Sequence, residues 1–331
     1  MSPKQKRALI NAIGILLSAT FLYLCFHSLD REALKQAFLL PHPWFLLAIV
    51  ALNLLLMGVR AQLWSYLLRS LKALPFMTLF EVEHIGYMAN NLLPLKAGEF
   101  FRASFVSKKW KLPYTQVLTT VGLERFFSGY TLILILLVVA EFLKLPLWIR
   151  TGAYVTGAVL VAVQIWLMIL WKKKPDLVKW KNRNPLVYRL IEFFSHVGEG
   201  SQALRRPLTF LHLSLLALAS WTIQALMLWI IQRAFEIPLG IMPTLFVMLA
   251  INLATAIPSA PSGIGTFEFA AVLAYGYLGV PKATALGIGF YFHFLQAIPI
   301  TLIGLFYYFR WGLKIKDIEE AEVKTMISEA G

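Results

Sequence analysis

Long apolar runs are the feature of this 331-residue chain that most restricts its fold. A helix needs about 20 apolar residues to cross a bilayer. The segments that fit are 8–27, 43–68, 116–143, 147–171, 208–234 and 284–309. The longest polar segment, 172–207, is too short to bury a core of its own. We therefore expect an all-α polytopic membrane protein that works in the membrane or beside it.

Charge and cysteine content exclude several classes of function. The formal net charge of +14 comes from Lys and Arg between the apolar runs, as in KKKPDLVKWKNR at 172–183. Such clusters are typical of cytoplasmic loops that contact anionic headgroups, so we expect no nucleic-acid partner. Cys25 is the only cysteine, which excludes an internal disulfide and a thiolate metal cluster. We expect no metal and no cofactor.

Two segments are too interrupted for one clean span. Residues 76–107 contain Asn, Pro, Gly and several charges, and 243–278 is broken by IPSAPSGIG at 257–265, here called the second tip. Each segment has room for two short helices, the pattern of a re-entrant hairpin whose exposed backbone lines a cavity. The fold prediction is six full transmembrane helices plus two re-entrant helical hairpins.

The basic loops test this topology. With two hairpins, every strongly basic loop falls on one side of the membrane, as the positive-inside rule requires, and both termini are cytoplasmic. Segments 43–143 and 208–309 then form an inverted repeat within a single domain, 1–309, followed by a cytoplasmic tail, 310–331. Broken segments at matching positions of inverted repeats point to a transporter site near the bilayer midplane.

Charges at membrane depth are the main functional signal. Each costs about 2.5–3.5 kcal/mol at a helix centre, so they must be paired or in contact with water. Glu99 and Arg102 are three residues apart and can pair on one helical face. Glu124 and Arg125 are neighbours, so we expect them to reach different partners on the hairpins. The alternative is that these charges only lock the hairpins to the long helices.

The second tip carries a different signal. Gly263 and Gly265 precede an apolar helical stretch, where glycines allow a ligand to approach and free N–H groups at a helix N-terminus suit phosphate. The alternative is a plain turn. Lys96, at the Pro/Gly break in the segment 76–107, is either a mobile point charge or a side chain that snorkels to the headgroups. His293, on one face of the last helix, is either a packing residue or a proton carrier.

Three stretches carry a family resemblance: NNLLPLKAGEFFR at 90–102, LERFFSG at 123–129 and PSGIGTFEFAAVLAYGYLGVP at 261–281. Together they resemble the lysylphosphatidylglycerol synthase transmembrane-region family. The resemblance implies a bacterial or archaeal inner-membrane protein that moves lipids between leaflets. Bifunctional relatives add a soluble aminoacyl-transfer domain, which we do not expect because the chain stops at Gly331. The chain departs from the family pattern at Ser128, Ser262 and His293.

We therefore expect a lipid transporter of the flippase type rather than an enzyme. A phospholipid or polyprenyl phosphate would place its anionic headgroup in a polar cavity between the hairpins. Basic residues would meet the phosphate, and acidic ones would hold those cations or exchange protons. The candidate site residues are Asn91, Lys96, Glu99, Arg102, Glu124, Arg125, Gly263, Gly265, Glu268 and His293. ATP cannot drive transport from within this chain, because a GxxxxGK[ST] loop is absent from its sequence.

Two other functions stay open. An intramembrane hydrolase could use Ser262 as nucleophile and His293 as base. A membrane scaffold could bind anionic lipid or a protein through its basic loop and tail. A second copy of the chain is a further candidate partner, as a homo-oligomer.

Overall fold

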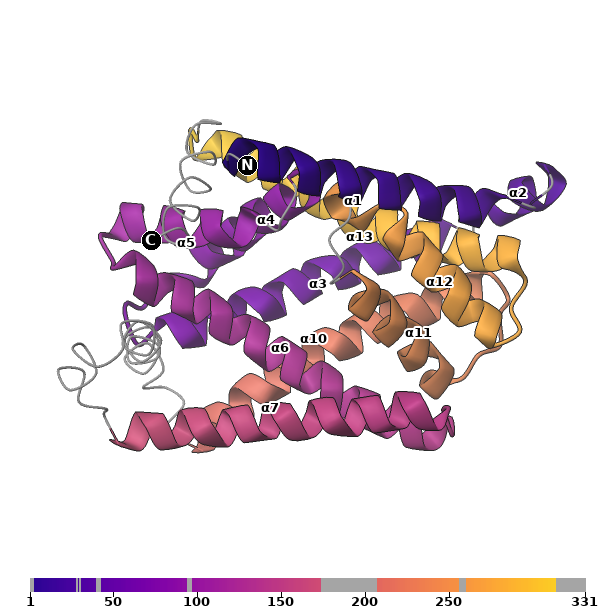
Figure 1. Ribbon diagram of the computed structural model, residues 1–331. Helices are drawn as coiled ribbons and strands as arrows, with labels where there is room; N and C mark the ends of the chain where they lie inside the picture. The colour runs from indigo at the N-terminus through magenta and orange to yellow at the C-terminus, as the bar shows by residue number, and fades with distance from the viewer. Residues whose placement is uncertain are drawn as a thin grey trace. The chain divides into compact units, whose positions relative to one another are not determined.

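The regular elements of the protein are helical throughout the part that its computed structural model describes (Figure 1). That part comprises residues 3–27, 29, 31–39, 43–93, 97–173, 207–255 and 260–313. The helices are α1 (Pro3–Phe26), α2 (Arg31–Ala37), α3 (Pro43–Leu68), α4 (Phe76–Leu92), α5 (Ala97–Trp110), α6 (Tyr114–Phe142), α7 (Leu147–Lys173), α10 (Pro207–Ala234), α11 (Ile241–Ala254), α12 (Thr266–Tyr277) and α13 (Lys282–Arg310), with a 3₁₀ turn, η3, at Pro261–Gly263.

Helix lengths repeat along the chain. The long helices α3 and α6, of 26 and 29 residues, flank the short α4 and α5, of 17 and 14 residues. Helices α10 and α13, of 28 and 29 residues, flank α11 and α12, of 14 and 12 residues. Both interrupted segments are therefore helix pairs, as the sequence predicts. The inverted orientation of the two repeats stays a prediction.

Within the described residues, four helices are long and apolar enough to cross a membrane, by length and composition. The candidate spans are Trp44–Leu68, Tyr114–Phe142, Leu208–Ala234 and Lys282–Arg310. The other two expected spans, 8–27 and 147–171, are present as the helices α1 and α7. The described chain is thus an all-helical membrane protein, and the count of six spans stays a prediction. Helix α2, of seven residues, was not predicted from the sequence.

The chain forms two compact units, which we describe separately. The first contains residues 1–58, 81–101 and 220–331, and the second contains residues 59–80 and 102–219. The units do not follow the boundaries of the two predicted repeats.

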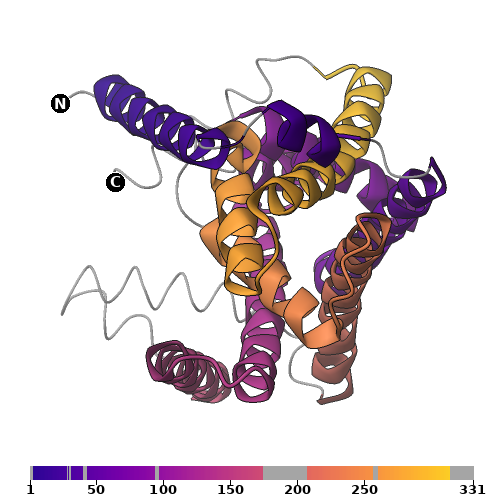
Figure 2. The ribbon, with the colours of Figure 1, turned by 90° about the vertical axis from the view of Figure 1, so that its right-hand side faces the viewer.

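In the first unit, α12 packs against three helices, α1, α11 and α13. In Figures 1 and 2 the orange α11 and α12 lie beside the orange-to-yellow α13. Phe269 stacks on Phe21 of α1 with ring centroids 4.6 Å apart. Lys282, at the start of α13, donates hydrogen bonds to the carbonyls of Leu24 and His27, 2.8 and 2.6 Å away. A cation at these carbonyls stabilises the C-terminal end of α1.

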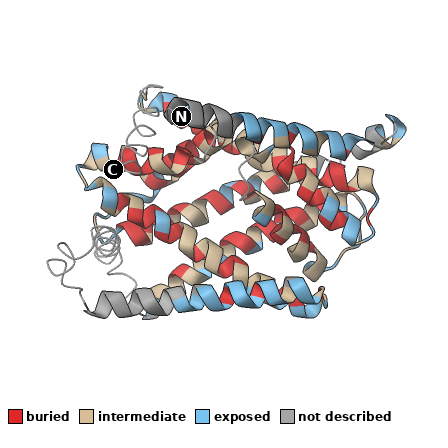
Figure 3. Cartoon of the chain, viewed as in Figure 1, coloured by how far each residue is buried: buried red, intermediate tan, exposed pale blue. Residues whose placement is uncertain are grey.

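In the second unit, α3, α6 and α10 share an apolar core. Its buried members are Leu63, Leu67, Leu123, Phe127, Leu213 and Ala217. Helix α7 packs against α6, and the described side chains of its first half are otherwise mostly exposed (Figure 3). Exposed apolar side chains on a helix of this kind are expected where lipid replaces water as the solvent.

Two adjacent asparagines close the first helix pair. Asn90 accepts a hydrogen bond from the backbone N–H of Gly98 at 2.9 Å, so it satisfies a donor in the first turn of α5. Helices α4 and α5 approach so closely here that a Cβ on Gly98 would lie 1.8 Å from the carbonyl oxygen of Gly86. Gly98 is therefore required by the contact between two backbones.

Replacing Gly98 with Ala should destabilise the first unit by about 1–3 kcal/mol, because α4 and α5 must move apart. The control is Gly122→Ala on α6, where an added Cβ would meet nothing within 4 Å. That change should be neutral or should stabilise the helix by up to about 1 kcal/mol. Thermal unfolding in detergent measures both variants, and equal unfolding temperatures would contradict the assignment.

Candidate functional site

Helix α13 contains a proline, and a side chain from α3 compensates for it. Pro299 has no N–H, so it cannot bond the carbonyl of Leu295 one turn earlier. The side-chain amide of Asn53 donates to Leu295 O at 3.1 Å and to Gln296 O at 3.0 Å. Asn53 is 1% exposed, so this pairing satisfies a polar group that water does not reach.

Asn91, predicted as a site residue, binds the same helix. Its side-chain amide donates to Thr301 Oγ1 at 3.0 Å and to Ala297 O at 3.3 Å. Ala297 lies one turn after His293 on α13, so the structure brings Asn91 to the helix that carries His293. Asn90 and Asn91 point to different partners because successive side chains of a helix point in different directions.

The second tip has an unusual backbone. Ser262, Gly263 and Gly265 have φ values of 61°, 78° and 87°, in the left-handed region. Ser18 of α1 holds the tip, because its hydroxyl accepts a hydrogen bond from the N–H of Ala260 at 2.9 Å. A Cβ on Gly265 would lie 2.5 Å from the carbonyl oxygen of the same Ser18. Gly265 therefore serves both the left-handed turn and the close packing against α1.

Replacing Gly265 with Ala should destabilise the first unit by more than the strain of a left-handed residue, which is about 1 kcal/mol. The matched control is Gly279→Ala, where φ is 79° but an added Cβ would meet nothing within 4 Å. The difference between the two unfolding free energies isolates the clash with Ser18. Equal losses would show that the tip is not packed on α1.

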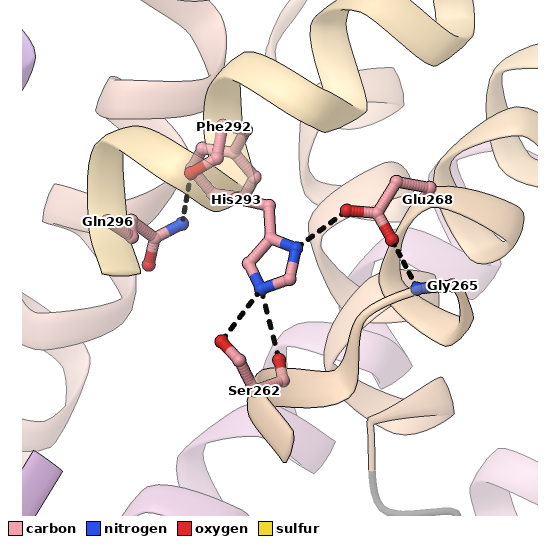
Figure 4. A network of polar contacts seen from close by, with 6 residues as sticks. All are labelled: Ser262, Gly265, Glu268, Phe292, His293 and Gln296. Carbon is pink, nitrogen blue, oxygen red and sulfur yellow. Dashed lines mark hydrogen bonds and ion pairs between the residues drawn. The ribbon is translucent and has the colours of Figure 1, made fainter. Parts of the chain in front are cut away.

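A chain of polar contacts joins the second tip to α13 (Figure 4). Glu268 accepts a hydrogen bond from the N–H of Gly265 at 2.7 Å, and its other oxygen lies 2.6 Å from His293 Nδ1. His293 Nε2 lies 3.0 Å from the hydroxyl oxygen of Ser262 and 3.0 Å from its carbonyl oxygen. His293 and Glu268 are 4% and 2% exposed. Phe267 stacks on the imidazole with centroids 4.4 Å apart.

The partners of His293 occupy both ring nitrogens. Nδ1 faces the Glu268 carboxylate, which accepts hydrogen bonds, so we assign a proton to Nδ1. Nε2 faces the Ser262 hydroxyl, which can donate or accept, and the Ser262 carbonyl oxygen, which can only accept. His293 and Glu268 therefore form a buried hydrogen-bonded pair.

Three backbone N–H groups just before α12 already have partners, and phosphate binding at the first turn of this helix stays a prediction. The N–H of Gly265 is bound by Glu268, so it is not free for phosphate. The N–H groups of Gly263 and Ile264 bind the carbonyls of Ala260 and Pro261 at 2.9 and 3.4 Å. In the described ranges, the buried hydroxyl of Thr266 has no hydrogen-bond partner.

The second unit holds a separate buried ion pair. Arg102 of α5 lies 2.7 Å from Glu124 of α6, and the two side chains are 1% and 2% exposed. The guanidinium lies 4.9 Å from the ring centroid of Trp64, whose indole N–H donates to Thr120 Oγ1 at 2.9 Å. The prediction that Glu124 reaches the first helix pair is confirmed.

For the other predicted site residues, the structure gives the degree of burial or does not describe the residue. Lys96 lies outside the described residues. Glu99 and Arg125 are half-buried, and the pairing of Glu99 with Arg102 stays a prediction. Asn91, Glu99, Gly263, Gly265, Glu268 and His293 belong to the first unit, and Arg102, Glu124 and Arg125 to the second. A cavity shared by all of them stays a prediction. In the described ranges, no group of three or more His, Cys, Asp or Glu side chains could hold a metal ion.

Sequence reasoning missed Ser18, Asn53 and Trp64. An asparagine near the middle of the run 43–68 is a usable signal, because an amide in an apolar helix needs a partner. Ser18 gives no comparable signal, since serine is common at contacts between membrane helices. Trp64 is one of ten tryptophans, and its place over Arg102 depends on packing between helices.

Sequence comparison finds relatives that are described as UPF0104 membrane proteins. A UPF0104 membrane protein of Methanothermobacter thermautotrophicus is 23% identical over 282 residues, which cover 79% of this chain and 82% of the relative. The UPF0104 membrane protein MJ1595 of Methanocaldococcus jannaschii is 21% identical over 315 residues, which cover 89% and 93% of the two chains. MJ1078 of the same organism is 24% identical over 225 residues, or 65% and 90%.

A family profile matches nearly the whole described chain. It is described as the lysylphosphatidylglycerol synthase TM region, and it covers residues 11–304. The match includes both helix pairs, the Arg102–Glu124 pair and the His293–Glu268 pair. The chain is therefore a multi-pass membrane protein that belongs to the family of lysylphosphatidylglycerol synthase transmembrane regions.

Proposed function

We propose that this protein moves a phosphate-bearing lipid between the two leaflets of a cell inner membrane, without ATP hydrolysis in this chain. The family is named for the synthase of a phospholipid, which supports a function connected with membrane lipids. The observation that carries the proposal is the buried His293–Glu268 pair, hydrogen-bonded near the middle of the candidate span Lys282–Arg310. Ionisable groups inside a membrane are costly and usually mark a transport pathway or a proton relay.

The contacts of Glu268 suggest how an anion would bind. Its carboxylate already occupies the place of an anion, because it accepts from Gly265 N–H at a helix N-terminus and pairs with His293. A lipid phosphate needs the same donors, and the buried hydroxyl of Thr266 adds one more. Phosphate and the Glu268 carboxylate therefore compete. The phosphate binds when it displaces the carboxylate from these donors, and it is released when the carboxylate returns to them.

The proposal includes an arrangement in the membrane. Six helices cross it, while α4–α5 and α11–α12 enter it as re-entrant hairpins. The N-terminus and the C-terminus of the chain are both cytoplasmic. The segments 43–143 and 208–309 have inverted orientations, so the two hairpins approach the midplane from opposite sides. The hydrocarbon chains of the substrate stay in the bilayer while its headgroup passes the polar groups.

Reconstituted liposomes test the transport proposal. Fluorescent phosphatidylglycerol, phosphatidylethanolamine, phosphatidylcholine and a polyprenyl phosphate are each incorporated, and a membrane-impermeant quencher reports leaflet exchange. We expect faster exchange than in protein-free liposomes for at least one of these lipids, with a rate that responds to a pH gradient. Monodisperse protein that binds lipid but accelerates none of them would favour the scaffold function instead.

One observation favours a second function, an intramembrane hydrolase. Ser262 Oγ, His293 and Glu268 follow one another in the order of nucleophile, base and orienting acid. Two features oppose this function. The Ser262 carbonyl competes for the nitrogen that would act as base. The next three N–H groups along the chain, at 263–265, are bound within the tip, so none of them is available to an oxyanion.

Product analysis separates the two functions. Wild-type protein incubated with the same lipids should release no fatty acid and no free headgroup, as measured by mass spectrometry of the lipid extract. The hydrolase function requires such a product, and it requires Ser262→Ala to abolish it. A product that depends on Ser262 would replace the transport proposal.

A further inference from the structure

An apolar groove runs between α10 and α11 in the first unit. It has a volume of about 460 Å³ and is lined by Thr222, Ala225, Leu226, Trp229, Ile241 and Leu245. On α10, Ala225, Leu226 and Trp229 follow Thr222 by three, four and seven residues, so the four side chains form one stripe along the helix. The two residues of α11 are four apart and form the facing stripe. The groove therefore follows α10 for about two turns, or about 10 Å.

The groove opens toward the surroundings of the helices. Leu226 and Ile241, one from each stripe, are 41% and 53% exposed. Helix α10 is one of the candidate membrane spans, so we expect lipid chains around this stripe. A membrane provides hydrocarbon chains that fit a narrow apolar groove, and close packing against them is favourable. The chemistry of the groove thus fits a hydrocarbon chain.

One end of the groove carries a cation. Arg233 lies one turn beyond Trp229 on α10, with its guanidinium 5.0 Å from the indole centroid. Arg233 is exposed, and within the described residues it forms no ion pair with a carboxylate, including the nearby Glu236. Guanidinium groups bind phosphate well, and tryptophan is frequent at the level of the headgroups. The end of the groove therefore fits a phosphate.

We propose that α10 and α11 bind a phosphate-bearing lipid, with its phosphate at Arg233 and one hydrocarbon chain in the groove. The site is separate from the His293–Glu268 pair and does not depend on transport. It adjoins the start of α11, the helix that leads to the second tip. The protein thus binds lipid at a second place, where a chain and a phosphate are recognised together.

Photolabelling in proteoliposomes tests the site. The probe is phosphatidylglycerol with a diazirine in one acyl chain, and the comparison probe is a diacylglycerol with the same chain and no phosphate. After illumination, mass spectrometry of peptides locates the adducts. We expect phosphatidylglycerol adducts concentrated on residues 222–229 and 241–245, several-fold above those on other lipid-facing helices. Adducts spread evenly over all apolar helices would overturn the proposal.

Two variants separate the chain from the phosphate. Leu226→Trp fills the groove and should lower its labelling by about tenfold, whereas Leu218→Trp, on the same helix and 42% exposed, should not. Arg233→Gln should reduce phosphatidylglycerol labelling to the diacylglycerol level, and Arg31→Gln, at another exposed arginine, should leave it unchanged. Equal effects of a variant and its control would overturn the corresponding half of the proposal. Arg233→Gln tests the site even where Leu226→Trp fails to fold.

Discussion

Replacing Arg102 with Gln should lower the free energy of unfolding by about 3–5 kcal/mol, the largest loss expected from any single change described here. The reason is the buried charge that remains. Glu124 is 2% exposed and lies 2.7 Å from the guanidinium, so removing the partner leaves a carboxylate without compensation away from water. The variant also loses the cation–π contact with Trp64, whose ring centroid lies 4.9 Å from the guanidinium.

Two comparisons make this result specific. Arg150→Gln removes an exposed ion pair with Glu141, so it should cost far less stability than Arg102→Gln. The double change Arg102→Met with Glu124→Leu replaces both charges by apolar side chains and should recover most of the stability. Urea or thermal unfolding in detergent measures all of them. An Arg102→Gln variant as stable as Arg150→Gln would contradict the importance of the pair.

The double variant also separates structure from transport. If the ion pair only locks α5 to α6, a folded Arg102→Met, Glu124→Leu protein keeps its leaflet exchange. If Arg102 meets the headgroup, the same folded protein loses it. We expect the loss of exchange, because burying the Arg102 guanidinium costs free energy. Apolar side chains could hold α5 against α6 equally well, so a structural role alone does not explain the charge.

Replacing Glu268 with Gln should reduce leaflet exchange by about tenfold or more while the protein stays folded. Gln has the shape of Glu, and its oxygen can still accept from Gly265 N–H, so the turn of the tip keeps its hydrogen bond. Its amide nitrogen cannot accept the hydrogen bond that His293 Nδ1 donates to Glu268. The negative charge is lost, and with it the competition that releases a bound phosphate. A hydrogen bond to a charged group contributes about 1.5–3 kcal/mol, and about 1.4 kcal/mol corresponds to a tenfold change.

The control for Glu268→Gln is Glu236→Gln, which changes an exposed carboxylate in the turn after α10. It should exchange lipids as fast as the wild type. The pH gradient gives a second readout: exchange by the wild type should respond to it, and exchange by Glu268→Gln should not. Equal rates and equal responses in both variants would remove Glu268 from the transport mechanism.

Much of the fold could be predicted because its signals are local. Apolar length alone places α3 at 43–68, and the Pro and Gly residues of the second tip predict the break between α11 and α12. Helix α2 could not be predicted, because seven residues in a polar loop give too few turns for a pattern. Local signals thus specify where the long helices begin and end.

The site was predicted less completely, for a physical reason. Glu268 and His293 could each be singled out as polar residues at membrane depth. Their pairing could not, because they are 25 residues apart and meet only when α12 packs against α13. The same holds for Asn53, which bonds a carbonyl 242 positions away. Contacts between helices decide which polar groups meet, and the sequence pattern of one helix does not contain them.

Pro299 gives α13 a point at which the helix can bend. A helix interior normally resists bending because each bend strains its own hydrogen bonds, but the carbonyl of Leu295 is held by a side chain of another helix. Bending at Pro299 therefore requires the exchange of one side-chain contact. His293 lies in the part of α13 before Pro299, and Thr301, bound to Asn91, lies in the part after it. Bending at Pro299 would shift the His293–Glu268 pair relative to Thr301 while both parts of the helix stay rigid.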